Sequence, residues 1–283
     1  MANQLPVIDL LAVMDTVAVV MREDMLWINW TVVQITSQPS KDQLHRLIQL
    51  RGLDTVHDWL SCGPMIFASL LDGDFTADPV PLECEFVGVA RDGVVATIKD
   101  ANQCSMRARV AYVIVRSLMC KVRFCVSSKA DGKGHVVGVG LVGGDAVLRN
   151  PNLVLMWRRN ANAPYDDAIQ LHPSAKHELL FVDVSFGSGV TRRLYIELTP
   201  GQIDGFATDA TKAVFWEPPP VYSNLLEIVR DDAWFHEFRV SIGLKALGWM
   251  TYYDVMEKVC EKALKADLRH MPLDYLSRFG CAR

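Results

Sequence analysis

The chain has 283 residues, of which 50% are hydrophobic and 22% are charged, so it can bury a globular core without disulfide or metal staples. A formal net charge of −4 and a pI of about 6.0 offer no basic excess to a phosphate backbone, and we expect no nucleic-acid partner. The cysteines include no CxxC pair, which argues against a zinc knuckle or a redox dithiol and favours a reducing compartment.

The first part of the chain, residues 1–75, is predicted to form a helical N-terminal segment. Its apolar opening, LPVIDLLAVMDTVAVVM, lacks a basic leader and is interrupted by Asp9 and Asp15, and charges are costly inside a bilayer. We therefore expect a buried helix over residues 5–22, no membrane contact and a cytoplasmic protein.

Further helices are expected within the same segment. Ser40 and Gln43 are spaced as a capping box ahead of an amphipathic run. The run TVHDWLSCGPMIFASLL also has a helical pattern, and its break at Gly63-Pro64 predicts the start of a new helix.

Residues 76–216 are predicted to form an α+β core. Alternating apolar residues on both sides of Arg91-Asp92-Gly93 predict a first hairpin. Residues 105–119 keep helical spacing, and the stretches KVRFCVSS and HVVGVGLV that follow have the pattern of strands. The segment 143–175 is rich in loop residues, so we expect it to leave the core.

A second hairpin is predicted where HELLFVDVSF and RRLYIELT flank a turn at Gly187–Gly189. The prolines of WEPPPVY then end the core. Residues 217–283 are predicted to be a helical C-terminal segment, with one helix over 250–267. The order of helices, strands, a central helix, strands and helices indicates an α+β fold, and we expect the three segments to form one compact unit.

Two sequence motifs are rejected as cofactor or metal sites. GVGLVGG fits the dinucleotide fingerprint GxGxxG, but Pro151 cuts short the helix that should follow, so a glycine-rich strand is the better interpretation. HELLF begins like a zinc-protease helix at His177, yet Phe181 stands where the second histidine is required. We therefore expect no cofactor, no metal ion and metal-independent chemistry.

Cys104 lies directly before the central helix, where unpaired N–H groups and the macrodipole stabilise a thiolate. Arg107 and Arg109 would add positive potential. A nucleophile also needs a base and a group that orients the base. If the second hairpin turns about Gly187–Gly189, position 177 pairs close to position 199, and Glu197 then lies within diagonal cross-strand reach of His177.

This order of residues resembles the transglutaminase-like branch of the papain-like cysteine hydrolase and acyltransferase superfamily. The pieces that carry the resemblance are NQCSMRARVAYVIVRSL, KHELLFVDV and YIELTPGQIDGF, within residues 84–206. The resemblance implies a central helix packed on an antiparallel sheet. It implies Cys104 as nucleophile, His177 as general base and acid, and Glu197 as the orienting carboxylate.

The resemblance also implies supporting residues, and this chain departs from the family pattern in two respects. Gln103 and Ser105 flank the nucleophile, and Gln202 matches a glutamine of the family that serves packing more than chemistry. The family usually has Asp where this chain has Glu197. The gap between the cysteine and the histidine is longer than usual, which implies an insertion around 143–175.

The expected activity is hydrolysis or acyl transfer on an amide, ester or thioester of a small-molecule or peptide acyl substrate, through an acyl-enzyme on Cys104. Two alternatives stay open. Cys62 also precedes a predicted helix and lies near His57 and Asp58, although its apolar neighbours would raise a thiol pKa. The other alternative is a non-catalytic binding or scaffold protein on the same fold.

Overall fold

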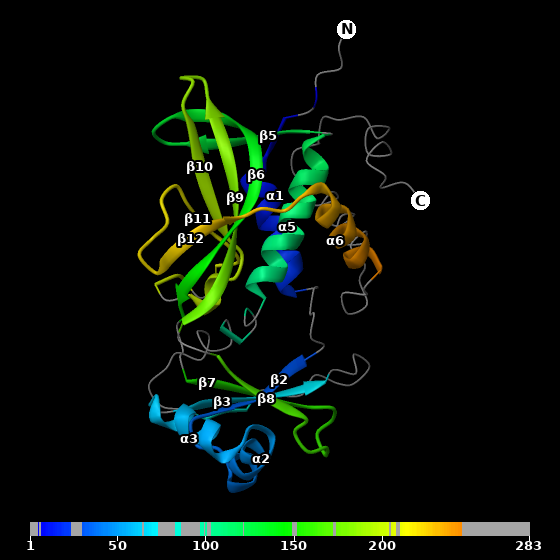
Figure 1. The fold of residues 1–283 in the computed structure, drawn as a ribbon, viewed down its shortest axis with the longest axis vertical. Helices are drawn as coiled ribbons and strands as arrows, with labels where there is room; N and C mark the ends of the chain where they lie inside the picture. Colours follow the sequence, from blue (N-terminus) through cyan, green and yellow to red (C-terminus); the bar gives the residue numbers. More distant parts are fainter. Residues whose placement is uncertain are drawn as a thin grey trace.

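The structure is a computed structural model that describes residues 5, 7–23, 30–63, 65–72, 83–85, 97–98, 100, 103–120, 122–148, 152–171, 174–203, 205–207 and 210–244. The helix expected over 250–267 lies outside these residues. Two separate sheets, each with its own helices, make up the fold, which is α+β as predicted (Figure 1). In the described part of the chain, no helix has the length and apolar character needed to cross a membrane.

The larger sheet has seven strands and is antiparallel except at one edge. The parallel pair is formed by the first strand of the chain, β1, and β5. In spatial order the strands are β1 (Val7–Asp9), β5 (Arg123–Ser128), β6 (Gly132–Val147), β9 (Ser174–Phe186), β10 (Thr191–Glu197) and β11 (Ala213–Phe215), with β12 (Tyr222–Ile228) paired to β6.

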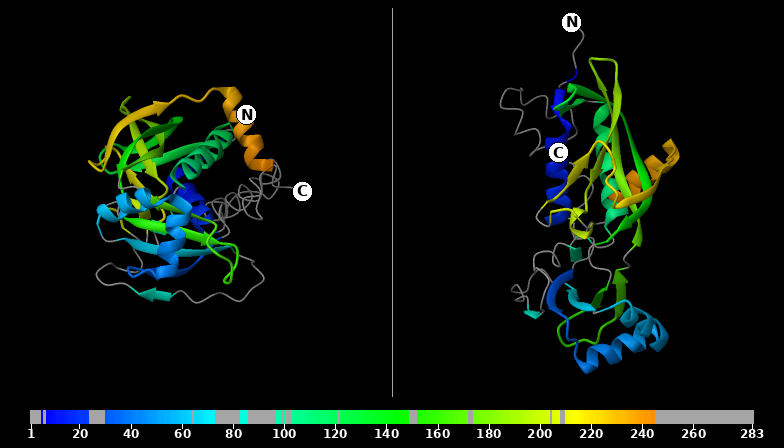
Figure 2. Two further views of the ribbon diagram at one scale, coloured as in Figure 1. Left: turned by 60° about the horizontal axis from the view of Figure 1, so that its bottom comes forward. Right: turned by 90° about the vertical axis from the view of Figure 1, so that its left-hand side faces the viewer.

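Three helices accompany this sheet: α1 (Leu10–Glu23), α5 (Cys104–Met119) and α6 (Asp232–Leu244). Helix α5 packs against β6 and β9, and α1 lies beside α5 (Figures 1 and 2). The helices and the sheet share one hydrophobic core. It includes the fully buried side chains of Met14 from α1, Ile114 from α5 and Val182 from β9. Each such side chain contributes roughly 1.5–3 kcal/mol of hydrophobic stabilisation. The predicted helices over 5–22 and 105–119 are confirmed, and their ends agree with the prediction to within five residues.

The smaller sheet has five strands in the order β4 (Glu83–Glu85), β2 (Trp30–Thr36), β3 (Ile66–Asp72), β7 (Leu153–Arg158) and β8 (Asp167–Leu171). Helices α2 (Lys41–Arg51) and α3 (Leu53–Ser61) lie on one side of it (Figure 2). Helix α2 begins with the predicted capping box, in which Ser40 and Gln43 exchange side-chain and backbone hydrogen bonds.

Several segments predicted as helix or loop are strands. Residues 30–36 and 66–72 were expected within the helical segment 1–75, and β7 and β8 fall in the expected loop excursion 143–175. A short apolar run that is buried on both faces lacks the alternation that distinguishes a strand from a helix. The helix expected at Gly63-Pro64 is therefore the central strand β3.

Two smaller corrections concern the ends of the predicted core. The hairpin predicted around 91–93 is wrong in its second arm. The residues of that arm that the structure describes, 97, 98 and 100, are helical and not extended. The first arm, β4, pairs in parallel with β2. Within the segment 217–283, β12 is a strand and only α6 is a described helix.

The glycine-rich run GVGLVGG is a strand, as predicted, because it lies wholly inside β6. A Cβ on Gly140 would lie 2.4 Å from the Phe181 ring, and one on Gly144 would lie 2.5 Å from the carbonyl oxygen of Ser223. The glycines therefore allow β9 and β12 to pack closely on β6.

Candidate active site

The structure places Cys104 as the first residue of α5, so its sulfur lies at the positive end of the helix macrodipole. The side chain is half-buried, and Sγ lies 4.0 Å from the hydroxyl oxygen of Ser105 and 4.0 Å from the carbonyl oxygen of Lys176. Gln103 occupies the N-cap position, and its side chain makes no capping hydrogen bond within the described residues. The helix start thus presents the thiol to β9.

His177 and Glu197 are brought together by the β9–β10 hairpin. The register pairs Leu180 with Ile196, which puts position 177 opposite position 199 and leaves Glu197 on its diagonal, as predicted. His177 Nε2 lies 2.6 Å from Glu197 Oε2, and each side chain is only 1% exposed. With Nε2 used by the carboxylate, Nδ1 is the ring nitrogen left for the thiol, and the Cys104 thiol and the His177 ring lie close enough for each to shift the pKa of the other.

The Glu197 carboxylate is held by a shell of donors. The Tyr222 hydroxyl donates to Oε2 at 2.6 Å, and the backbone N–H and hydroxyl of Thr199 donate to Oε1 at 2.6 and 2.8 Å. A buried carboxylate needs such partners, since an unpaired buried charge is strongly destabilising. The longer Glu side chain therefore reaches the imidazole while its charge stays fully hydrogen-bonded.

Gln202 lies on the other side of the imidazole. Its Nε2 atom lies 3.5 Å from His177 Nδ1 and 3.1 Å from the Thr199 hydroxyl oxygen, and the side chain is buried. The short 3-10 helix η1 (Pro200–Gln202) carries it. Gln202 thus packs beside the ring and is tied to the same residue that binds Glu197.

Sequence analysis missed Tyr222 and Thr199. Thr199 could have been found, because a hydroxyl residue two positions after a carboxylate commonly hydrogen-bonds to it locally. Tyr222 has no local signal, because it reaches Glu197 only through the pairing of β12 with β6.

The charges of the three residues favour a thiolate and an imidazolium. Burial alone would raise the pKa of Cys104, but the hydrogen bond and positive charge of His177 outweigh it and lower that pKa below its ordinary value. Burial would lower the pKa of His177, but the Glu197 charge and the Cys104 hydrogen bond raise it to about 10. Burial likewise opposes ionisation of Glu197, and the charge and hydrogen bond of His177, aided by Tyr222 and Thr199, keep its pKa below the usual range.

A cavity of about 280 Å³ adjoins this group. Its lining includes His177, Ser105 from the start of α5, and Gly143 and Gly144 from β6. Asn224, also in the lining, has a φ of 53° and donates to Asp145 Oδ2 at 3.0 Å. Asn tolerates this left-handed conformation better than most residues, so the irregular start of β12 can form one wall of the cavity.

Arg107 and Arg109 do not act as free positive charges beside the thiol. Arg109 binds the Glu178 carboxylate through two nitrogens, with Nε 2.8 Å from Oε2, and so ties α5 to β9 next to His177. Arg107 Nη1 lies 2.6 Å from Asp100 Oδ1, and both side chains are buried. Their role is to fix the helix start against the hairpin.

The Asp100–Arg107 ion pair also anchors η1, because Asp100 Oδ2 accepts from the Gly201 N–H at 2.8 Å. We expect Asp100→Asn to lower the free energy of unfolding by roughly 3–5 kcal/mol, since Arg107 would stay buried without its counter-charge. Urea denaturation measures this change. The matched control is Asp166→Asn, which removes an exposed partner of Arg159 at 3.5 Å and should cost less than about 1 kcal/mol. Equal losses in the two variants would contradict this role of Asp100.

The alternative nucleophile Cys62 lies in a different setting from the predicted one. It ends α3 and does not precede a helix, and its exposed thiol donates to the carbonyl oxygen of Asp58 at 3.3 Å. The prediction that Cys62 lies at a helix start is therefore wrong.

Comparisons with protein-family models, with curated proteins and with solved structures give no match. Within the described residues, no three His, Cys, Asp or Glu side chains are grouped so that they could hold a metal ion. The described side chains of the site form a cysteine–histidine–glutamate group beside a cavity.

Proposed function

We propose that the protein is a thiol-dependent hydrolase or acyltransferase with a transglutaminase-like, papain-like core. The observation that carries the proposal is a thiol at a helix start whose pKa is lowered by a nearby buried imidazole, which is itself held by a carboxylate. A nucleophile, a base and an orienting group in this relation are what acyl transfer through a covalent intermediate requires.

In the proposed reaction, the Cys104 thiolate attacks the carbonyl carbon of an amide, ester or thioester. As the tetrahedral intermediate collapses, the His177 imidazolium gives its Nδ1 proton to the leaving group, and the acyl group remains on Sγ. Neutral His177 then takes a proton from water or from an amine, which attacks the acyl carbon and releases the thiolate. Glu197 holds the ring in the orientation needed for both transfers through Nε2.

The oxyanion of the intermediate requires donors close to the sulfur. Backbone N–H groups at the start of α5, near Ser105, are the proposed donors, and one such donor typically contributes about 2.7–4 kcal/mol to transition-state stabilisation. The cavity beside Ser105 and His177 is the proposed site for a small-molecule or peptide acyl substrate. Four of the described cysteines are free thiols, namely Cys62, Cys104, Cys120 and Cys125, which agrees with a proposed cytoplasmic setting.

The pH dependence of alkylation tests the proposal. We expect Cys104 to react rapidly with iodoacetamide below about pH 7, whereas an ordinary thiol has a pKa of about 8.5. Labelling should be fast at lower pH than for an ordinary thiol because the thiolate persists above the lowered pKa of Cys104. Its imidazolium partner persists up to about pH 10. The rate is followed by mass spectrometry of the labelled peptide across pH 5–10.

The exposed thiols of Cys62 and Cys120 serve as internal references in the same experiment. A Cys104 rate that rises together with theirs, near pH 8.5, would remove the enzymatic proposal and favour the binding or scaffold alternative. A mass spectrum after incubation with a panel of activated acyl esters then reports whether the sulfur is acylated and which acyl groups it accepts.

A further inference from the structure

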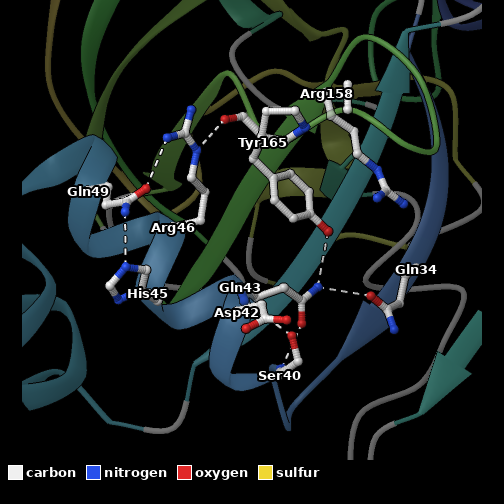
Figure 3. A pocket seen from close by; sticks show the side chains of 11 residues that line it. Gln34, Ser40, Asp42, Gln43, His45, Arg46, Gln49, Arg158 and Tyr165 are labelled. Carbon is white, nitrogen blue, oxygen red and sulfur yellow. Dashed lines mark hydrogen bonds between the residues drawn. The ribbon is translucent and has the colours of Figure 1, made fainter.

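The smaller sheet carries a second cavity, of about 510 Å³, that shares no lining residue with the cavity beside His177. It lies between α2, β2, the end of β7 and the segment before β8, and Figure 3 shows its polar side chains. Pockets of about 300–1,000 Å³ are the usual size for small-molecule sites. Its composition therefore indicates which class of ligand fits.

One wall of this cavity is a fixed hydrogen-bond network centred on Gln43. The Gln43 side chain is buried, and its Nε2 lies 3.0 Å from Gln34 Oε1 and 3.2 Å from the Tyr165 hydroxyl (Figure 3). The same nitrogen lies 3.3 Å from Ser69 Oγ. Arg46 adds a bond from Nε to the Tyr165 carbonyl oxygen at 2.7 Å. Side chains locked in this way form a preorganised site.

Two donor groups on the cavity are left over from this network. Arg158 Nε is buried, and no described residue accepts a hydrogen bond from it or pairs a carboxylate with its guanidinium, which lies 5.3 Å from the Tyr165 ring centroid. Gln34 accepts through Oε1, which leaves its NH₂ group unused by the described residues. Within the described residues, the Arg158 guanidinium and the Gln34 amide therefore keep hydrogen-bonding capacity that an acceptor bound in the cavity could use.

The charged side chains that line the cavity also favour an anionic ligand. Arg46 and Arg158 line the cavity together with one carboxylate, Asp42, which is exposed at the start of α2. The Arg and Asp side chains of the lining together carry a net formal charge of +1. A guanidinium binds planar or tetrahedral oxyanions through paired N–H bonds, and this geometry is specific to carboxylate and phosphate groups.

We propose that this cavity binds a small organic molecule through a carboxylate or phosphate group. The Arg158 guanidinium makes the paired contact, and the Gln34 amide donates a further hydrogen bond. The site is independent of the thiol chemistry at Cys104.

Isothermal titration calorimetry of the full chain with succinate and, separately, with inorganic phosphate tests the proposal. We expect saturable binding of at least one probe, and the one that binds identifies the preferred oxyanion. Arg158→Gln should weaken binding at least about tenfold, because it removes a charged hydrogen-bond pair. The matched control is Arg159→Gln, which removes the same charge from the neighbouring, 80% exposed side chain and should leave the affinity within about twofold.

Gln34→Glu provides a second variant that keeps the side-chain shape and the acceptor oxygen but puts a negative charge on the cavity. It should also weaken binding at least about tenfold, and it replaces Arg158→Gln if that variant fails to fold. Absence of saturable binding of both probes at about 10 mM, or equal weakening by Arg158→Gln and Arg159→Gln, overturns the proposal. Iodoacetamide labelling of Cys104 should be unchanged in all three variants, which separates this result from the test of the thiol site.

Discussion

Cys104→Ala is expected to abolish acylation of the protein by activated esters and to lower kcat/KM for any hydrolysed ester by at least about 10³-fold, because among the described residues of the site only Cys104 can form the thioester. The adduct is read by intact-protein mass spectrometry, and turnover is read from release of the leaving group. The fast phase of iodoacetamide labelling should disappear together with the activity.

The control for this variant is Cys62→Ala, which removes an exposed thiol at the end of α3. That change should leave the adduct and the turnover within about twofold, since a surface substitution away from the site has little effect. Retained ester turnover in Cys104→Ala, or its loss in Cys62→Ala, would contradict the assignment of the nucleophile.

Glu197→Gln is expected to lower the rate of acylation by about 10²–10⁴-fold, the scale seen when the group orienting a catalytic histidine loses its charge. Glutamine keeps the side-chain length but removes the charge that raises the pKa of His177 to about 10. The imidazolium that pairs with the Cys104 thiolate would then be lost at lower pH. Without that positive partner the pKa of Cys104 should rise, so the onset of rapid labelling should move to higher pH, toward the ordinary thiol value of about 8.5, as measured by the same alkylation series.

Tyr222→Phe is the graded control for this prediction. It removes one hydrogen bond to Glu197 Oε2 and keeps both the carboxylate and the ring packed near His177. A hydrogen bond to a charged group contributes about 1.5–3 kcal/mol, so a rate loss of roughly 10–100-fold is expected. If Glu197→Gln left the alkylation profile unchanged, the carboxylate would have a structural role only.

The parts of the site that sequence could predict are those set by local geometry. A Gly-Ser-Gly turn fixes the register of β9 and β10, and that register alone puts Glu197 diagonal to His177. The apolar spacing of residues 105–119 defines α5 and so places Cys104 at its start. Each inference depends on residues fewer than 25 positions apart, where turn type and periodicity are informative.

The smaller sheet could not be predicted, because its pairings join distant segments. β3 and β7 are apolar on both faces, so their sequences show neither the alternation of a half-buried strand nor the periodicity of an amphipathic helix. The composition of 143–175 predicts a loop, because the polar residues between β7 and β8 outnumber the apolar residues of these two short strands in local patterning. The Tyr222 contact to Glu197 and the cavity beside Arg158 depend on the same kind of long-range arrangement.

The central position of β3 has a consequence for how the chain is made. Leu153 of β7 pairs with Ile66 of β3, which is 87 positions earlier in the chain. At a synthesis rate of about 5–20 residues per second, an apolar strand edge would emerge from the ribosome roughly 4–17 s before its neighbour exists. Until β7 is made, this open edge of β3 can pair with strands of other chains, because unpaired strand edges promote aggregation.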